Sequence, residues 1–261
     1  ETLAAHLVAN GHDGIVVNGT TGEAPTTKSS EKEEIIRVVR NTVGSKITVL
    51  SGAGDNETEY SINQAKRTEN AGADGLLVVT PYYNKPNQEG LYQHYMKIAD
   101  SVEIPQILYN VPSRTACDLR PETVSRLSYH PNIVGIKEAV DDAVRLDELM
   151  SIRERQNDQK YFAVLSGDDP TFSEFMSTGG DGVISVAANI LPSQIAKICG
   201  LNLEGHYEDA KELNDMYRNI FELFFSRRVI WIRIRMIFAC EFAVSLCDFF
   251  CGRIFIDAEY G

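Results

Sequence analysis

The sequence is poor in the residues that build metal sites and disulfide frameworks. It has five histidines and five cysteines in 261 residues, and no two cysteines are spaced as CxxC. Cys247 and Cys251 are spaced to share one face of a helix, but no histidine or carboxylate partner stands at ligand spacing. We therefore expect no bound metal, no disulfide, and reduced thiols in a cytoplasmic protein.

The chain also lacks a net positive charge and long apolar runs. The formal net charge is −12, from 25 Lys and Arg against 37 Asp and Glu, which argues against nucleic acid or an anionic membrane surface as a partner. Near the C-terminus, charges such as Arg233 and Glu241 interrupt every apolar run before it reaches the ~20 residues of a membrane span. Nothing at the N-terminus resembles a signal peptide. Anionic small substrates remain compatible, because one local basic group is enough to bind them.

What the chain does contain is a series of short, continuous apolar runs. Continuous runs are typical of strands buried on both faces of a parallel sheet. Their starting points are spaced by roughly the length of one strand–helix unit. The seven runs cover residues 14–18, 47–52, 75–79, 106–109, 133–137, 162–166 and 182–186.

Amphipathic helical patterns fill the intervals between these runs. Two capping-box patterns, Ser30-x-x-Glu33 and Asn56-x-x-Glu59, predict where the first two of these helices begin. The predicted helices cover residues 31–43, 57–71, 88–101, 121–128, 140–155, 170–178, 192–201 and 207–225.

Seven strand–helix units are one short of the eight in a closed parallel barrel. The chain opens with a helical stretch over 1–10 rather than a strand. We therefore predict an α/β TIM (β/α)8 barrel that lacks its first strand in this chain, followed by C-terminal helices and an atypical tail. An open doubly wound sheet is the alternative, which the even spacing and the absence of a GxGxxG turn disfavour.

The expected organisation has three parts. Residues 1–200 form the barrel, 201–225 a helical region, and 226–261 a tail rich in Arg, Phe and Ile. A missing strand leaves open edges at 14–18 and 182–186, and unpaired backbone groups there predict low stability. The tail is not expected to fill the gap, because 229–235 alternates as a half-exposed strand does.

Candidate catalytic groups gather at the strand ends, where a barrel of this kind has its active site. The run 133–137 ends on Lys137. A strand-end lysine usually extends its head into water; in a pocket that excludes water, it can instead become a neutral nucleophile toward a carbonyl. Hydroxyl, phenol and guanidinium groups follow the other runs, at Thr20, Thr21, Tyr82, Tyr83, Tyr109 and Arg114. Taken together, they favour Schiff-base chemistry in which a tyrosine moves protons.

Four motifs carry a resemblance to a known family. They are Gly19-Thr20-Thr21-Gly22-Glu23, Pro81-Tyr82-Tyr83-Asn84, Tyr109-Asn110-Val111-Pro112-Ser113-Arg114-Thr115 and Gly135-Ile136-Lys137-Glu138-Ala139. In this order and spacing the chain resembles the dihydrodipicolinate synthase family of pyruvate-dependent class I aldolases, from about residue 3 to about residue 225.

The resemblance implies a role for each motif. Lys137 forms an imine with pyruvate, whose carboxylate is held by Thr20 and Thr21 and by backbone near Gly167 and Ile184. A proton relay joins Tyr109, Thr21 and Tyr83, with Tyr83 supplied by a neighbouring subunit. Arg114 binds the carboxylate of aspartate semialdehyde. The catalytic residues are therefore expected to be Lys137, Tyr109, Thr21 and Tyr83.

The resemblance also implies partners and regulation. The product is 4-hydroxy-tetrahydrodipicolinate, no cofactor or metal takes part, and the usual assembly is a homotetramer built as a dimer of dimers. Asn56 and Tyr82 are candidate allosteric residues. Lysine inhibition is expected to be weak, because Tyr60 stands where lysine-sensitive members have a glutamate and Lys32 adds a like charge nearby.

Two other functions remain open at this point. One is a sister activity with the same imine, such as N-acetylneuraminate lyase or a 2-keto-3-deoxy sugar acid aldolase. Arg114 argues against it, because a guanidinium suits a second substrate that carries a carboxylate. The other is a catalytically inactive fragment, which soluble expression and a melting curve would distinguish from an enzyme.

Overall fold

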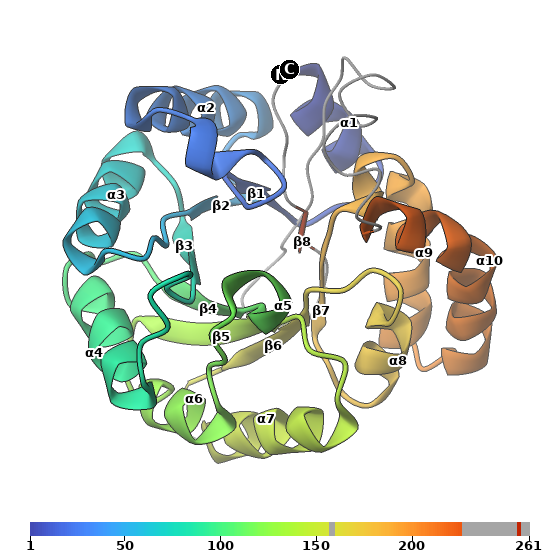
Figure 1. The fold of residues 1–261 in the computed structure, drawn as a ribbon. Helices are drawn as coiled ribbons and strands as arrows, with labels where there is room; N and C mark the ends of the chain where they lie inside the picture. Colours follow the sequence, from blue (N-terminus) through green and yellow to red (C-terminus); the bar gives the residue numbers. More distant parts are fainter. Residues whose placement is uncertain (157–159, 226–254, 257–261) are drawn as a thin grey trace.

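The strands form a barrel surrounded by helices (Figure 1). The computed structural model describes residues 1–156, 160–225 and 255–256. Strands β1 to β7 are parallel, and each pairs with the next along the chain. The predicted barrel is therefore confirmed. The strands are β1 (Gly14–Val17), β2 (Thr48–Gly52), β3 (Gly75–Val79), β4 (Gln106–Asn110), β5 (Ile133–Glu138), β6 (Ala163–Ser166) and β7 (Gly182–Ser185).

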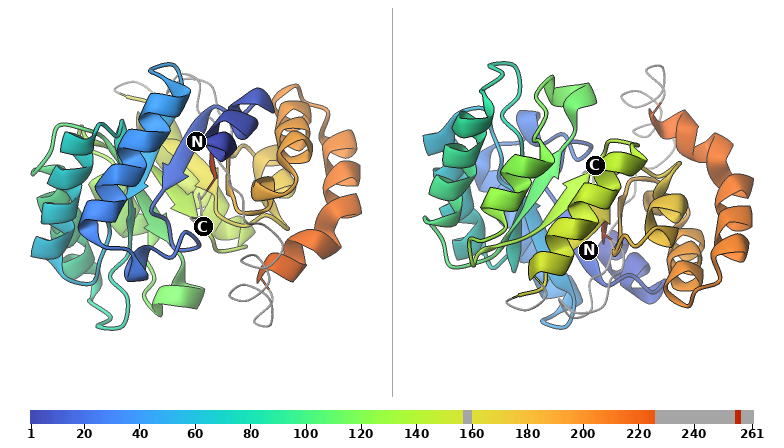
Figure 2. Two further views of the ribbon diagram at one scale, coloured as in Figure 1. Left: turned by 90° about the horizontal axis from the view of Figure 1, so that it is seen from above. Right: turned by 90° about the horizontal axis from the view of Figure 1, so that it is seen from below.

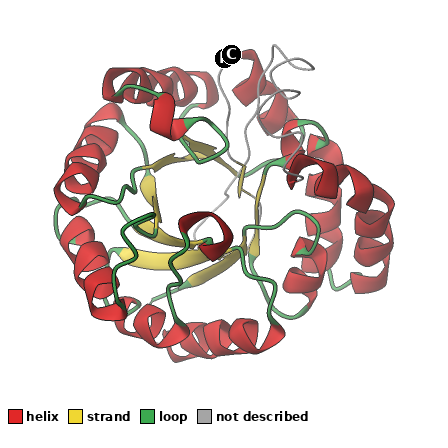
Figure 3. Cartoon of the chain, viewed as in Figure 1, coloured by secondary structure: helices red, strands yellow, loops and turns green. Residues whose placement is uncertain are grey.

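A helical layer covers the outside of the strands, and Figure 3 shows the two layers in different colours. Figure 2 shows α10 outside α9, at one edge of the barrel wall. The predicted domain boundary at residue 200 falls inside α9. None of the described helices is long and apolar enough to cross a membrane. The helices are α1 (Thr2–Ala9), α2 (Ser29–Val43), α3 (Thr58–Ala71), α4 (Gln88–Ala99), α5 (Pro112–Thr115), α6 (Pro121–Leu127), α7 (Ala143–Gln156), α8 (Phe172–Ser177), α9 (Pro192–Leu203) and α10 (Tyr207–Phe225).

The edge of β7 that was expected to be open is paired with a strand of two residues, β8 (Phe255–Ile256). It runs parallel to β7, pairing Ile184 with Phe255 and Ser185 with Ile256, and lies beside β1. The sequence does not predict this strand, because two residues are too few to carry a periodic pattern. The expectation for residues 229–235 lies outside the described residues.

The two predicted capping boxes are wrong in position. Helix α2 begins two residues early, and the backbone N–H of Lys28 donates to Glu31 Oε2 at 2.7 Å. Helix α3 is capped by Glu57, whose carboxylate accepts from the N–H groups of Glu59 and Tyr60. In both helices a carboxylate binds the N-terminal N–H groups, since the positive end of the helix dipole favours an anion there.

Apolar side chains pack on both faces of the barrel wall, which explains the continuous apolar runs. Inside the barrel, one buried cluster contains residues from every strand from β1 to β7 except β5: Val16, Leu50, Leu77, Ile107, Tyr109, Leu165 and Ile184. Two larger clusters lie between the strands and the helices. The interior is therefore filled, and polar chemistry is left to the ends of the strands.

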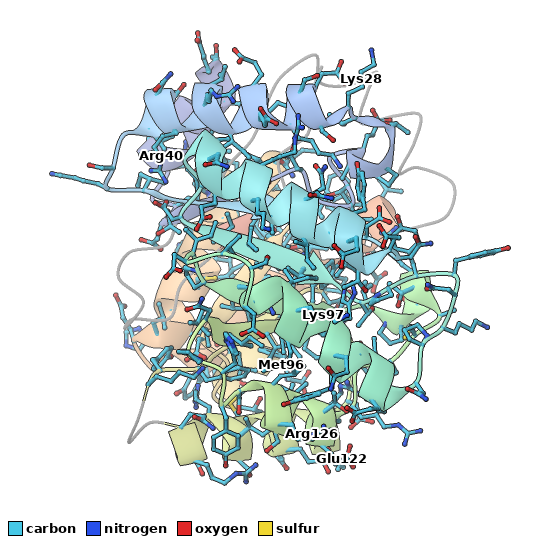
Figure 4. All side chains as sticks on the ribbon, turned by 90° about the vertical axis from the view of Figure 1, so that its left-hand side faces the viewer. Lys28, Arg40, Met96, Lys97, Glu122 and Arg126 are labelled. Atoms are coloured by element: carbon cyan, nitrogen blue, oxygen red, sulfur yellow. The ribbon has the colours of Figure 1, made fainter. Side chains whose placement is uncertain are left out.

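Polar clamps hold the amino ends of the strands. Figure 4 views the face made by α2, α3, α4 and α6, with Arg40 and Lys28 at opposite ends of α2. Arg40 pairs with Asp74 and donates to the carbonyls of Ile47 (2.9 Å) and Gly44 (2.7 Å). This arginine therefore ties α2 to the segments that lead into β2 and β3.

A second clamp lies at the amino ends of β6 and β7. Asp181 accepts from Arg153 Nη1 at 2.8 Å and from the N–H of Val164 at 2.7 Å, and it also binds the Tyr161 hydroxyl. Burial raises the pKa of Asp181, and the hydrogen bonds to the carboxylate oppose that rise. The pair formed by Arg153 and Asp181 ties the C-terminal half of α7 to the barrel.

Candidate active site

A lysine side chain is buried near the carboxyl end of β5. Side chains alternate along a strand, so Lys137 faces the barrel interior because its neighbour Ile136 packs against the helices. Only 2% of the Lys137 surface is exposed. The amine therefore lies in the buried interior of the barrel and does not extend into water, which favours the second of the two interpretations made from sequence.

Tyr109 lies beside this lysine on the neighbouring strand. The parallel register of β4 and β5 pairs Tyr109 with Lys137. Lys137 Nζ is 4.4 Å from the centroid of the Tyr109 ring. The strand register thus brings a phenol and an amine into contact.

The loop that carries the two threonines leaves β1 through a tight turn. Asn18 adopts a left-handed conformation (φ 57°), and its side chain donates to Ser51 Oγ at 2.9 Å. Gly52 approaches so closely that a Cβ there would lie 2.0 Å from the Asn18 carbonyl oxygen. The turn at Asn18 is therefore packed directly against β2.

The threonines themselves are positioned to bind a ligand. Thr20 lines a cavity at the carboxyl ends of the strands. Within residues 1–156, 160–225 and 255–256, the buried hydroxyl of Thr21 has no hydrogen-bond partner. A buried hydroxyl without a partner costs roughly 1–3 kcal/mol, so a ligand that binds Thr21 would recover that loss.

The cavity has a volume of about 220 Å³. Its lining includes four predicted site residues, Thr20, Tyr82, Tyr109 and Arg114. Lys137 is not part of the lining, but Tyr109, whose ring the amine contacts, is. The cavity therefore connects the tyrosine beside Lys137 with the arginine at the rim.

Arg114 lies on α5, a single helical turn directly after β4. Pro112 starts this turn, and the N–H of Arg114 donates to the Val111 carbonyl at 2.9 Å. The guanidinium is exposed, and in the described part of the chain it has no ion-pair partner. An unpaired guanidinium on the wall of a cavity suits a carboxylate ligand.

Gly167 and Ile184 lie near the carboxyl ends of β6 and β7, and neither is part of the cavity lining. A Cβ at Gly167 would lie 3.0 Å from Lys137 Cε, so the absence of a side chain at Gly167 leaves room for the lysine. The N–H of Gly167 donates to the Glu138 carbonyl at 2.7 Å. Ile184 on β7 is buried inside the barrel. Gly167 therefore leaves space for the lysine, and Ile184 belongs to the apolar interior of the barrel.

Residues 1–243 match the Dihydrodipicolinate synthetase family. The chain belongs to this family. The match extends beyond residue 225, where the resemblance carried by the motifs ends.

Two curated relatives and one crystal structure illustrate the similarity. The 4-hydroxy-tetrahydrodipicolinate synthase of Persephonella marina is 45% identical over 219 residues, which cover 84% of this chain and 73% of the relative. The enzyme of the same name from Pseudomonas putida is 48% identical over 206 residues (79% and 69%). The crystal structure of chloride-inhibited dihydrodipicolinate synthase from Acinetobacter baumannii complexed with pyruvate has a TM-score of 0.83 and 41% identity, covering 90% of this chain and 79% of that one.

Tyr83 is a predicted site residue that does not lie close to the other predicted site residues of this chain. It adopts a left-handed conformation (φ 73°) in the loop after β3, and 87% of its surface is exposed. It is absent from the lining of the cavity. Within one chain, Tyr83 is therefore separate from Lys137 and Thr21, and a role in the relay needs a second copy.

The two candidate allosteric residues differ in position. Tyr82 lines the cavity, and its hydroxyl donates to Asp55 Oδ2 at 2.9 Å. Burial, together with the bond to Asp55, raises the pKa of Tyr82 to about 12. Asn56 is not part of the lining, and its carbonyl accepts from Asn84 Nδ2. Asp55 was missed from sequence, although it directly follows the small residues at the end of β2.

A buried polar cluster behind Lys137 was also missed. Glu138 is 2% exposed and accepts from Asn110 Nδ2 (3.0 Å) and from Arg145 Nε (2.6 Å). Arg145 also pairs with Asp118 at 3.0 Å. Burial raises the pKa of Glu138 to about 7, and the bonds from Arg145 and Asn110 oppose that rise. The signal in the sequence was a glutamate directly after the strand-end lysine.

Among the residues that the structure describes, no group of three or more His, Cys, Asp or Glu side chains is arranged to hold a metal ion. The buried thiols of Cys117 and Cys199 are free cysteines. Burial raises the pKa of both thiols, which disfavours the reactive thiolate.

Proposed function

We propose that this chain condenses pyruvate with L-aspartate 4-semialdehyde, through a Schiff base on Lys137, to give 4-hydroxy-tetrahydrodipicolinate. The observation that carries the proposal is the buried amine of Lys137, 4.4 Å from the Tyr109 ring. Relatives that are named for this synthase support the same reaction. The chain is then a lyase of the class I aldolase type, acting at the first step of the lysine and diaminopimelate branch.

The covalent steps follow from the chemistry of an amine and a ketone. Lys137 Nζ attacks the keto carbon of pyruvate, and loss of water gives the imine. Loss of a methyl proton converts the imine to an enamine, whose terminal carbon attacks the aldehyde of the second substrate. The amino group of that substrate then adds to the imine carbon, closes the ring and releases Lys137.

The pyruvate carboxylate is held, in this proposal, by the threonine loop. The buried hydroxyl of Thr21, without a partner in the described residues, supplies one donor. Thr20 lies on the cavity wall beside it. Backbone near Gly167 and Ile184 completes the site, which leaves the keto carbon directed at the lysine.

Arg114 binds the carboxylate of aspartate semialdehyde, in this proposal. The guanidinium lies at the wall of the cavity that also reaches Tyr109, so one substrate can contact both residues. A sugar acid aldolase would gain less from this arginine, because polyol hydroxyls do not match a bidentate cation. The relatives do not favour that alternative.

Tyr109, Thr21 and Tyr83 form the proposed proton relay, with Tyr83 reaching the site of a neighbouring subunit. The exposure of Tyr83 supports a role outside its own chain. The assembly proposed is a homotetramer built from dimers, in the cytoplasm. In this proposal the barrel domain comprises residues 1–200 and a helical region comprises 201–225, followed by an atypical tail over 226–261 of which Phe255–Ile256 pairs with β7.

The test is chemical trapping of the imine. The chain is incubated with pyruvate, reduced with borohydride, digested and analysed by mass spectrometry. One reduced pyruvyl group on the peptide that contains Lys137 is the expected result. A label on another lysine, or no label in a chain shown by circular dichroism to be folded, contradicts the proposal. Lys137→Arg is the matched control and should remain unlabelled.

A further inference from the structure

The strands that carry Lys137 and Tyr109 continue by one residue each, into a second buried pair. Register pairs Asn110 with Glu138, directly after the pair of Tyr109 and Lys137. Because side chains alternate, the second pair faces the helices while the first faces the pocket. Asn110 and Glu138 are 0% and 2% exposed. The two pairs are thus joined through the backbone on opposite faces of the same strands.

The Glu138 carboxylate is saturated with donors. Asn110 Nδ2 donates to both of its oxygens, at 3.0 and 3.2 Å. The N–H of Val140 donates to Oε1 at 3.0 Å, and Arg145 Nε to Oε2 at 2.6 Å. Every contact presents a proton to the carboxylate, so the ionised form fits this cluster. Glu138 therefore joins β4, β5 and α7 at one point.

The cluster also reaches the segment that follows Arg114. The N–H of Leu119 donates to Asn110 Oδ1 at 2.9 Å, and Arg145 binds the Leu119 carbonyl. Asp118 accepts from Asn110 Nδ2 at 3.0 Å. The strand ends and the loop after α5 are consequently held by one network of hydrogen bonds.

We propose that Glu138 is a positioning residue for Lys137, because its carboxylate fixes the β4–β5 register that places the amine over the Tyr109 ring. The inference rests on the proposed function, since it gives Glu138 a part in imine formation. A reacting amine that is misplaced by about 1 Å can lose on the order of 100-fold in rate. Glu138 itself does not touch the pocket.

The experiment compares two buried carboxylates that pair with the same helix. Glu138→Gln removes the charge that faces Arg145, at the carboxyl ends of the strands. Asp181→Asn does the same to Arg153 at the amino ends, where the pair is 2.8 Å apart and remote from the cavity. Both variants should lower the melting temperature, so stability alone does not separate a positioning role from a structural one.

The separating measurement is the single-turnover rate of imine formation at saturating pyruvate, well below either melting temperature. Glu138→Gln should slow it by roughly 10- to 100-fold, whereas Asp181→Asn should leave it within about twofold. Half-saturation by pyruvate should change little in either variant, because Thr20 and Thr21 are outside the network. Amide exchange at Ala139, whose N–H donates to the Asn110 carbonyl at 3.0 Å, should accelerate in Glu138→Gln alone.

Two outcomes overturn the inference and are distinguishable. An unchanged rate in Glu138→Gln, or an equal loss in both variants, refutes the role of Glu138 and leaves the proposed function standing. No imine in the unsubstituted, folded chain refutes the proposed function and with it the role of Glu138.

Discussion

Gly167 lies against the side chain of Lys137, so closely that a Cβ at this position would be 3.0 Å from Lys137 Cε. The lysine reaches its place over Tyr109 because residue 167 has no side chain. This contact comes from the turn after β6, in which the N–H of Gly167 donates to the Glu138 carbonyl. The glycine at the end of β6 thus determines where the Lys137 side chain of the neighbouring strand β5 can lie.

Gly167→Ala should displace the lysine and slow imine formation by on the order of 10-fold. The rate is measured by borohydride trapping at several times after mixing with pyruvate. Gly200→Ala on α9 is the matched control, since no atom lies within 4 Å of its added Cβ. That control should raise the melting temperature slightly, because alanine favours a helix over glycine by up to about 1 kcal/mol. Equal imine rates in both variants would show that the contact has no consequence.

Tyr109→Phe should lower kcat by on the order of 100-fold or more, since it removes a group that moves protons. Trapping of the pyruvate imine should be reduced less than turnover with both substrates. Turnover is followed by a coupled assay of the condensation product. Tyr161→Phe, at the amino ends of the strands, controls for loss of a partly buried phenol. A kcat within about threefold of the parent would remove Tyr109 from the relay.

Arg114→Ala should cost on the order of 10- to 100-fold in kcat/KM for aspartate semialdehyde, the effect of losing a charge-assisted contact of about 1.5–3 kcal/mol. Pyruvate imine formation should survive better, because the arginine lies at the rim. Arg120→Ala removes an exposed arginine outside the cavity lining and should have little effect on either rate. If Arg114→Ala impaired both steps equally, the arginine would be structural.

His94 on α4 should make the fold sensitive to acid. Burial lowers its pKa from 6.5 to about 4, although Asp55 and Glu57 oppose that fall. Between pH 6.5 and 4 the unfolded chain therefore binds a proton that the folded chain excludes, and stability falls as pH falls. The contribution is at most about 3 kcal/mol.

His94→Asn tests this prediction, because an amide can keep the contact with Thr58 Oγ1, now 2.9 Å from Nδ1, without taking up a proton. Urea unfolding at pH 7 and at pH 4.5 gives the free energy of unfolding of both proteins. The parent should lose more stability than the variant between the two conditions. Parallel losses would mean that other groups cause the acid sensitivity.

Lysine should inhibit the reaction weakly, with half-maximal inhibition above about 1 mM. Tyr60 and Lys32 both line the cavity, and neither supplies a carboxylate partner for the effector's ammonium group. Initial rates at increasing lysine measure the effect. Tyr60→Glu should increase sensitivity, and Tyr129→Glu is a control at an exposed tyrosine elsewhere. Inhibition of the parent at sub-millimolar lysine would overturn the expectation.

The strands could be predicted from the sequence because a buried parallel strand leaves a continuous apolar run. All seven runs are strands, and their ends differ from the prediction by at most one residue. The cavity residues Tyr109, Thr20 and Arg114, and Lys137 beside Tyr109, could be placed together because parallel strands end on one face of a barrel. The positions of these residues therefore follow from topology and strand ends.

The rest depends on contacts between segments that are distant in the sequence. The turn α5 has four residues and shows no periodicity, so the prediction left it out. The cluster of Asn110, Glu138 and Arg145 joins three elements, and a single charged residue gives no sign of its partners. Whether Tyr83 acts in another copy stays a prediction, since one chain holds only half of that contact.

The clamps made by Arg40 and by Asp181 lie at the ends of the strands away from the cavity. Substitutions there would change how long the barrel survives heat without changing what it binds. Natural variants selected for the reaction alone are free to differ at that end, and an engineer can raise heat tolerance there first. Thermal stability and catalytic activity can therefore be changed independently in this barrel, by natural selection or by design.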